Sequence, residues 1–178
     1  MSKSEINLGI DSQCLSYWLD SLDELVEPID NLAVEKIALT RIWLYTEGGF
    51  TASETVIAEC QNIKNHERRQ LHNSWVGTHI HNPPIRDNEY IKQRTKALSK
   101  FHSGEQDCRI LAEAEEIGLD ILLTYDFNFL NRLREKSDNI LLYKPSEYWS
   151  KLNLSHGIKP NIIPHKTNPM SVQEWWRW

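Results

Sequence analysis

Hydrophobic positions along this chain change their spacing from one segment to the next, and the changes mark alternating strands and helices. Short apolar runs, of the kind that form buried strands, lie at residues 6–10, 50–53, 119–124 and 140–143. Apolar positions at helical spacing, or polar stretches bounded by glycine and proline, predict helices over residues 12–19, 33–46, 55–72, 87–101, 106–117 and 146–152. Such alternation is typical of βαβ units, so the pattern predicts an α/β fold with a central parallel sheet.

Cap residues set several of the predicted boundaries. Ser12 and Ser146 are the expected N-caps of the helices that they open, because a serine oxygen accepts a hydrogen bond from a free N–H of the first turn. Gly48-Gly49 and Gly118 are expected to end helices, since glycine readily takes the left-handed conformation found there. Residues 73–86 carry no clear period and predict no regular element.

The C-terminal stretch differs from the rest of the chain. Beyond residue 153 it is rich in proline and asparagine and loses its hydrophobic period. We therefore expect one domain at residues 1–152 and an irregular C-terminal extension, or tail, at 153–178. The tryptophans at its end, Trp175, Trp176 and Trp178, are expected to pack against apolar surface or to meet a protein partner; stacking on nucleic-acid bases is the alternative.

Length and composition fit one globular domain. The chain has 178 residues, of which 40% are hydrophobic and 25% charged, and these are ordinary values for a soluble protein with one sizeable core. No apolar run approaches the length of a membrane span, and the first residues lack the hydrophobic stretch of a signal peptide. We therefore expect a cytoplasmic protein. Its three cysteines lie far apart, which argues against a disulfide framework and against a thiolate zinc site.

The net charge narrows the function classes. Lys and Arg number 20 against 25 Asp and Glu, which gives a formal charge of −5. A protein that binds nucleic acid only by neutralising phosphates is normally basic, whereas an enzyme that grips phosphate through bound metal can be acidic, because the cations reverse the local field. The composition therefore disfavours a passive nucleic-acid-binding module more than it disfavours a metal-dependent nuclease.

Two acids follow predicted strands. Asp11 comes directly after the strand at 6–10, and Asp126 follows the strand at 119–124 by two residues. Ligands of an open parallel sheet gather outside the carboxyl ends of its strands. If the two strands are neighbours, both carboxylates lie at the same edge. Taken alone, Asp126 is equally well explained as a turn residue.

Two further acids share a helix face with apolar residues. Asp107 lies three residues before Ile110 and four before Leu111, and Glu59 lies three residues after Val56. Both acids are therefore expected to point toward the core side of their helices. A buried carboxylate needs a partner, either a structural Lys or Arg or a hard cation. For Asp107 the alternative is a first-turn acid favoured by the helix dipole.

Together these segments resemble the PIN-domain nuclease family, which includes the VapC-like toxins of type II toxin–antitoxin pairs. The resemblance covers roughly residues 6–152, and its last segment is the most specific. The matching segments are Ile10-Asp11-Ser12, Val56-Ile57-Ala58-Glu59, Gly104-Glu105-Gln106-Asp107, Ile110-Leu111-Ala112 and Leu122-Leu123-Thr124-Tyr125-Asp126-Phe127-Asn128-Phe129-Leu130.

The resemblance implies a fold, a cofactor and an activity. The implied fold is a PIN-like three-layer α/β/α arrangement around the parallel sheet. The implied activity is hydrolysis of RNA phosphodiester bonds with Mg²⁺ or Mn²⁺, hard ions that carboxylates suit. The residues implied as metal ligands, or as acids that orient the attacking water, are Asp11, Glu59, Asp107 and Asp126.

Neighbouring polar residues complete the implied site. Ser12 and Thr124 are implied as hydroxyls that orient the carboxylates. Asn128 belongs to the same supporting group and stands where many members of the family have a further Asp. Its presence implies that the free protein holds one metal firmly and that a second arrives with the substrate. Glu105, two residues before Asp107, could substitute in part for the missing acid.

A basic stripe runs along the helix predicted at 87–101. Lys92, Lys96 and Lys100 recur at four-residue spacing and therefore share one face. A solvated face is the plain explanation of such a stripe, and contact with an RNA backbone is the functional alternative.

Three functions remain open. The leading hypothesis is a metal-dependent endoribonuclease that acts as the toxin of a toxin–antitoxin pair, with RNA as substrate and an antitoxin protein as partner. The alternatives are a housekeeping or defence nuclease without an antitoxin, and a catalytically silent PIN-like scaffold that binds RNA or protein. No membrane partner is expected, and a homodimer is one possible assembly.

Overall fold

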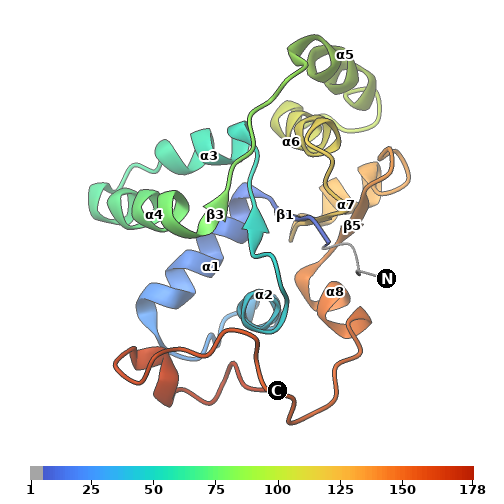
Figure 1. The fold of residues 1–178 in the computed structure, drawn as a ribbon. Helices are drawn as coiled ribbons and strands as arrows, with labels where there is room; N and C mark the ends of the chain where they lie inside the picture. Colours follow the sequence, from blue (N-terminus) through green and yellow to red (C-terminus); the bar gives the residue numbers. More distant parts are fainter. Residues whose placement is uncertain (1–5) are drawn as a thin grey trace.

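A computed structural model describes residues 6–178 (Figure 1). Within these residues five strands form one sheet in the order β3-β2-β1-β4-β5, and every neighbouring pair is parallel. The strands are β1 (Leu8–Ile10), β2 (Phe50–Thr51), β3 (Ile80–His81), β4 (Ile121–Leu123) and β5 (Leu141–Tyr143). The sheet confirms the predicted α/β fold, and it makes β1 and β4 neighbours.

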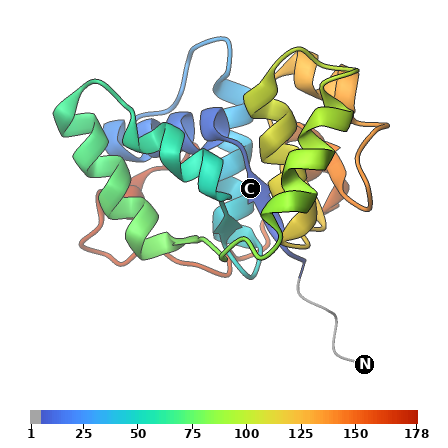
Figure 2. The same cartoon turned by 90° about the horizontal axis from the view of Figure 1, so that it is seen from above.

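Eight α-helices of the described residues flank the sheet, consistent with a three-layer α/β/α arrangement (Figures 1 and 2). None of them is long and apolar enough to cross a membrane. The helices are α1 (Ser12–Glu24), α2 (Ala33–Tyr45), α3 (Glu54–Gln61), α4 (His66–His79), α5 (Asn88–Leu98), α6 (Glu105–Glu116), α7 (Phe127–Leu133) and α8 (Pro145–Lys151), and a 3₁₀ turn lies at Pro169–Val172.

The order of the strands reverses between β1 and β4. From β1 the chain adds β2 and then β3 on one side, and it later adds β4 and β5 on the other side. Both central strands are buried at every position, as expected for parallel strands that are covered on both faces. In an open parallel sheet, ligands bind outside the carboxyl ends of the strands at such a point of reversal.

The helix predicted at residues 55–72 is wrong in its extent, because the structure has two helices there. α3 ends at Gln61 and α4 begins at His66. Asn65 forms a new N-cap, since its side chain accepts a hydrogen bond from the Arg68 N–H (2.9 Å). α4 then continues to His79 and leads into β3, a stretch for which the sequence predicted no regular element.

Both predicted serine caps are also wrong. α1 is capped by Asp11, whose carboxylate accepts a hydrogen bond from the Cys14 N–H (2.6 Å), and Ser12 is the first helical residue. α8 begins at Pro145, and Ser146 lies inside it. Proline suits the first helical position because the N–H that it lacks would have no partner within the helix.

The tail at residues 153–178 has little regular structure, as predicted, but it packs against the rest of the chain. Arg41 of α2 donates hydrogen bonds to three of its carbonyls, those of Trp175 (3.3 Å), Trp176 (3.2 Å) and Arg177 (2.8 Å). Trp176 is only 1% exposed. The tail therefore lies along α2 (Figure 1), and Trp175 and Trp176 take the packing role rather than forming an exposed stacking surface.

Candidate functional site

The carboxyl ends of β1 and β4 lie side by side, and an acid follows each strand. Asp11 is the first residue after β1, and its N–H donates a hydrogen bond to the Leu123 carbonyl of β4 (3.0 Å). Asp126 follows β4 and caps α7 by accepting hydrogen bonds from the N–H groups of Asn128 (2.7 Å) and Phe129 (2.9 Å). The neighbouring strands therefore bring Asp11 and Asp126 to one edge of the sheet, as the sequence predicted.

Thr124 influences both of these acids. Its side chain is buried, and its hydroxyl accepts a hydrogen bond from the Asp126 N–H (3.0 Å). The same hydroxyl acts to lower the pKa of the Asp11 carboxyl. Ser12, the other hydroxyl predicted to orient the acids, lines a surface hollow, and Asn128 is exposed.

Asp11 is the most deeply buried of the four predicted acids, with 4% of its surface exposed. Burial raises the pKa of its carboxyl from the ordinary 3.8 to about 6; hydrogen bonds from Thr124 and Cys14 oppose this rise, and the nearby charge of Asp107 adds to it. Within residues 6–178, no Lys, Arg or His forms an ion pair with Asp11. It is therefore a buried carboxylate that no protein cation balances.

Asp107 lies in the first turn of α6 and contacts a histidine. His102 Nε2 lies 2.6 Å from Asp107 Oδ2, and the His102 side chain is only 9% exposed. The imidazole also stacks against Phe129 of α7, with ring centroids 6.3 Å apart. The sequence does not single out His102. One sequence signal could have pointed to it: His102 precedes Asp107 by five residues, and the predicted helix begins between the two.

Gly104 leaves room for this contact. A Cβ at position 104 would lie 2.5 Å from Asp107 Oδ2 and 2.6 Å from His102 Nε2, far inside normal contact distance. The φ angle of Gly104 is −75°, which any residue can adopt. The glycine is therefore needed for space and not for backbone freedom, and a larger residue would force the ring and the carboxylate apart.

Glu59 lies on α3 beside a surface hollow of about 270 Å³. The hollow is also lined by Ser12, Gln13 and Ser16 of α1. Because Ser12 follows Asp11 in the chain, the hollow adjoins the part of the sheet edge where Asp11 lies. Glu59 and Asp107 are both partly exposed, so neither points fully into the core as the helical spacing predicted.

The four acids do not converge on one point. Among residues 6–178, no group of three or more His, Cys, Asp or Glu side chains lies close enough together to hold a metal ion. Thr124 accepts a hydrogen bond from the Asp126 N–H and acts to lower the pKa of Asp11, whereas Asp107 lies near enough to raise that pKa. Joint binding of one cation would require the partly exposed side chains, Glu59 and Asp107, to turn from their present positions.

A fifth acid, Glu113 of α6, is fully buried and has partners of its own. Its carboxylate accepts hydrogen bonds from Thr55 N (2.9 Å), Thr55 Oγ1 (2.7 Å) and Arg109 Nε (2.8 Å). Burial acts to raise the pKa of Glu113, but the hydrogen bonds from Arg109 and Thr55 outweigh it and lower the pKa. The sequence does not single out Glu113, whose charge is balanced by Arg109 of the same helix and which joins α6 to α3 through the hydrogen bonds from Thr55.

The predicted basic stripe divides in the structure. Lys92 and Lys96 line a hollow between α5 and α6, whereas Lys100 is exposed beyond the end of α5 and does not line it. Lys92 and Lys96 are therefore the two lysines of the stripe for which an RNA contact remains an alternative to a solvated face.

Comparisons with known proteins assign no family: no family model matches the sequence, and no curated protein matches it either. Any functional assignment therefore depends on the residues at the sheet edge.

The chemistry available at this edge is that of carboxylate oxygens. Burial raises the pKa of all three cysteine thiols, Cys14, Cys60 and Cys108, so the thiols stay protonated at neutral pH and are poor nucleophiles. A buried carboxylate without a protein cation, by contrast, is a favourable acceptor for a hard divalent ion.

Proposed function

We propose that this chain is a PIN-like, metal-dependent endoribonuclease. The observation that carries the proposal is the position of Asp11 and Asp126, which follow the two neighbouring strands at which the sheet order reverses. Asp107 lies near enough to influence the charge of Asp11, and Glu59 lines the adjoining hollow. Two acids at the ligand-binding edge of an open parallel sheet, one of them buried without a protein cation, favour an enzyme over a scaffold.

The donor set fits Mg²⁺ or Mn²⁺. All four proposed ligands are carboxylates, which hard divalent ions prefer to sulfur or imidazole. Asp11 is buried without a protein cation, so a bound metal would supply the missing positive charge and favour the ionised carboxylate. When bound, the metal would lower the pKa of its water and stabilise the oxygens that gain charge during phosphodiester hydrolysis.

The residues of the chain position this chemistry. Thr124 accepts a hydrogen bond from the Asp126 N–H and favours the ionised form of the Asp11 carboxylate. His102 contacts one oxygen of Asp107, Oδ2, and leaves Oδ1 available to the metal. Glu59, partly exposed at the hollow, is the acid best placed to orient a water molecule that enters from solvent.

The proposal is tested by RNA cleavage. The purified protein should cleave single-stranded RNA with Mg²⁺ or Mn²⁺, and EDTA should stop the reaction. Asp11→Asn and Asp107→Asn should each lower the rate at least ~100-fold, because a lost ligand removes several kcal/mol of transition-state stabilisation. Cleavage of a labelled RNA, followed on a gel, measures both effects.

Asp23→Asn is the matched control. Asp23 is an exposed acid on α1, the helix that Asp11 caps. Its replacement should change the rate by no more than about twofold, as expected for a surface substitution. Full activity in EDTA would overturn the metal mechanism. RNA binding without any metal-dependent cleavage would favour the silent scaffold.

The toxin role makes a separate prediction. A small DNA-binding antitoxin, encoded beside this chain, should bind the protein and suppress cleavage of the labelled RNA. If no neighbouring gene product binds, the toxin role fails, and a nuclease with a housekeeping or defence role takes its place.

A further inference from the structure

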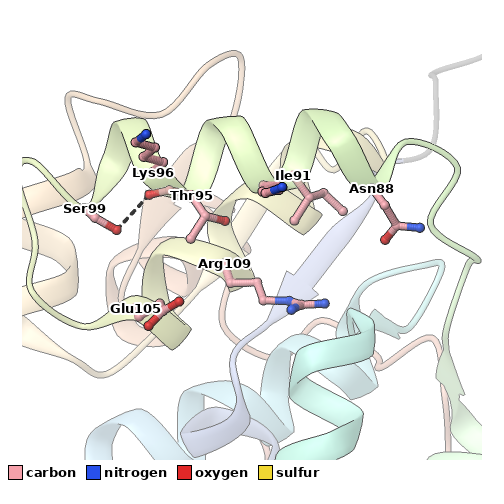
Figure 3. Close-up of a pocket in the computed structure, with 8 residues that line it drawn as sticks. Asn88, Ile91, Thr95, Lys96, Ser99, Glu105 and Arg109 are labelled. Atoms are coloured by element: carbon pink, nitrogen blue, oxygen red, sulfur yellow. Dashed lines mark hydrogen bonds between the residues drawn. The ribbon is translucent and has the colours of Figure 1, made fainter.

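The hollow between α5 and α6 is separate from the acids at the sheet edge. Its volume is about 500 Å³, and the two helices lie side by side in both views of the fold (Figures 1 and 2). Figure 3 shows Asn88, Ile91 and Thr95 of α5 turned toward α6, with Arg109 reaching from α6 below them. Lys92, Lys96, Ser99 and Glu105 complete the lining.

Three cations border this hollow without an acid to neutralise them fully. Lys92 and Lys96 form no ion pair with any residue of the described chain, 6–178. Arg109 uses only its Nε, on Glu113. Its two terminal nitrogens have no hydrogen-bond partner within the same residues, and its side chain is 47% exposed. These donors are available to a ligand.

The other acids of α6 are occupied elsewhere, which keeps the hollow positive. Glu115 binds Arg94 (2.6 Å), and Glu116 accepts hydrogen bonds from the backbone N–H groups of Arg86 (3.0 Å) and Asp87 (3.1 Å). Among residues 6–178, Glu105 is the one acid that lines the hollow. Two unpaired lysines, and an arginine whose counter-ion Glu113 is buried, therefore face Glu105, in a chain whose formal net charge is −5. A local excess of positive charge on an acidic protein attracts anions to that place specifically.

Neutral polar groups add hydrogen-bonding capacity. Thr95 Oγ1 is buried and has no hydrogen-bond partner within residues 6–178, and a group in that state is stabilised when a ligand supplies one. Asn88 contributes a side-chain amide at the opposite end of the hollow from Ser99 (Figure 3). Hydroxyl and amide groups can bind phosphate oxygens and sugar hydroxyls.

Two of the cations follow one another along α5. Lys92 and Lys96 are one helical turn apart on α5, about 6 Å along the axis, and the lining from Asn88 to Ser99 spans about 17 Å. Glu105 lies in the first turn of α6, the turn that also carries Asp107. Two cations spaced along a hollow of this length suit an elongated polyanion better than a single small anion.

We propose that the α5–α6 hollow binds the sugar–phosphate backbone of the RNA strand beside the cleavage site. The inference rests on the proposed ribonuclease function for its choice of RNA. Lys92 and Lys96 bind successive parts of the backbone from α5, and Arg109 binds it from α6. Thr95, Ser99 and Asn88 supply the neutral contacts. Lys100, although on the predicted stripe, takes no part.

The test measures binding apart from cleavage. A fluorescent single-stranded RNA of about 16 nucleotides is titrated with the full chain in EDTA, and anisotropy is recorded over a series of salt concentrations. The Lys92→Ala/Lys96→Ala variant should raise the Kd at least ~10-fold at low salt. Its salt dependence, the slope of log K against log salt, should become shallower by about 1.4, since each lost phosphate contact removes about 0.7.

Lys100→Ala/Lys159→Ala is the matched control, because it removes the same charge from two exposed lysines outside the hollow. Its Kd should stay within about twofold of the unmodified protein. Arg109 is kept in both variants, since it also holds Glu113. Thermal melts of both variants should match the unmodified protein, as expected for exposed lysines.

The outcomes separate this inference from the nuclease proposal. Equal weakening of RNA binding by both double variants would mean that only the total charge matters, and it would overturn the proposed groove. Failure of the unmodified protein to bind RNA would also overturn it. A selective effect of the Lys92/Lys96 variant, together with no metal-dependent cleavage, would support the groove while overturning the nuclease.

Discussion

Two buried carboxylates, Asp11 at the sheet edge and Glu113 between α3 and α6, lie in opposite electrostatic surroundings. Glu113 has an arginine and two donors from Thr55, and its pKa is lowered despite full burial. Asp11 accepts a backbone hydrogen bond from Cys14, forms no ion pair within residues 6–178, and has a pKa raised to about 6. Burial acts in the same direction on both, so their partners make the difference.

The difference separates a structural acid from a candidate ligand. A buried charge is tolerated when the fold brings its own counter-ion, as it does for Glu113. An acid that the fold buries without a counter-ion is costly when ionised, and a cation from solvent would remove that cost. We therefore assign Glu113 to stability and Asp11 to metal binding.

Glu113→Gln should be the most damaging change to stability, lowering the free energy of unfolding by about 2 kcal/mol. The amide cannot accept with its NH₂ group, so one Thr55 donor loses its partner and Arg109 loses its counter-ion. Arg109 is partly exposed and water can solvate it, which keeps the loss below that of a fully buried pair. Chemical denaturation measures the change.

Glu105→Gln serves as the control for this loss, because it removes an exposed acid from the same helix. It should change stability by less than about 0.5 kcal/mol. A Glu113→Gln protein as stable as the control would show that the ion pair contributes nothing to stability. The assignment of Glu113 as a structural acid would then be wrong.

Mg²⁺ should stabilise the protein through Asp11 and not through Glu113. At a free concentration ten times the Kd, binding to the native state adds about 1.4 kcal/mol. The melting temperature of the unmodified protein and of Glu113→Gln should therefore rise with Mg²⁺, whereas that of Asp11→Asn should stay nearly constant. An equal rise in Asp11→Asn, seen by scanning calorimetry, would place the metal elsewhere.

Without metal, stability should depend on pH through Asp11. Its folded pKa of about 6 lies above the ordinary 3.8, so the folded protein retains a proton that the unfolded chain has released. The stability contributed by that proton is present below about pH 4 and is lost as pH rises through 6. The metal-free protein should be on the order of 1 kcal/mol less stable at pH 7 than at pH 5.

Asp11→Asn isolates this pH effect. The amide oxygen can still cap α1 by accepting from Cys14 N–H, and the substitution removes the titrating group. Denaturation curves in EDTA should show a smaller loss between these two pH values for Asp11→Asn than for the unmodified protein. Identical pH dependence in the two proteins would mean that Asp11 keeps an ordinary pKa and is not an unbalanced charge.

The pattern of apolar positions predicted the two central strands well, because a strand buried on both faces is apolar at every position. The runs at 6–10 and 119–124 contain β1 and β4, which are buried throughout, and the run at 140–143 contains β5, whose Leu141 is exposed. No predicted run contains β3. The same pattern missed the break between α3 and α4. Residues 61–70 contain a single apolar side chain, Ile63, so the hydrophobic pattern gives no sign of the break, and the capping hydrogen bond of Asn65 marks the new start. Local chemistry of this kind competes with periodicity, and a single sequence does not show which prevails.

By itself, the sequence determined the α/β class, the parallel sheet and the acids that follow β1 and β4, since these depend on local hydrophobic period and on position along the chain. Tertiary structure decided which acids have partners. Thr55 lies 58 residues before Glu113 in the chain, and its hydrogen bonds help to stabilise the buried Glu113 carboxylate. Helical spacing alone predicted a buried acid at Asp107 and gave no sign of the one at Glu113. The charge state of a carboxylate depends on what the fold places within a few ångströms, and those neighbours come from segments that are distant in sequence.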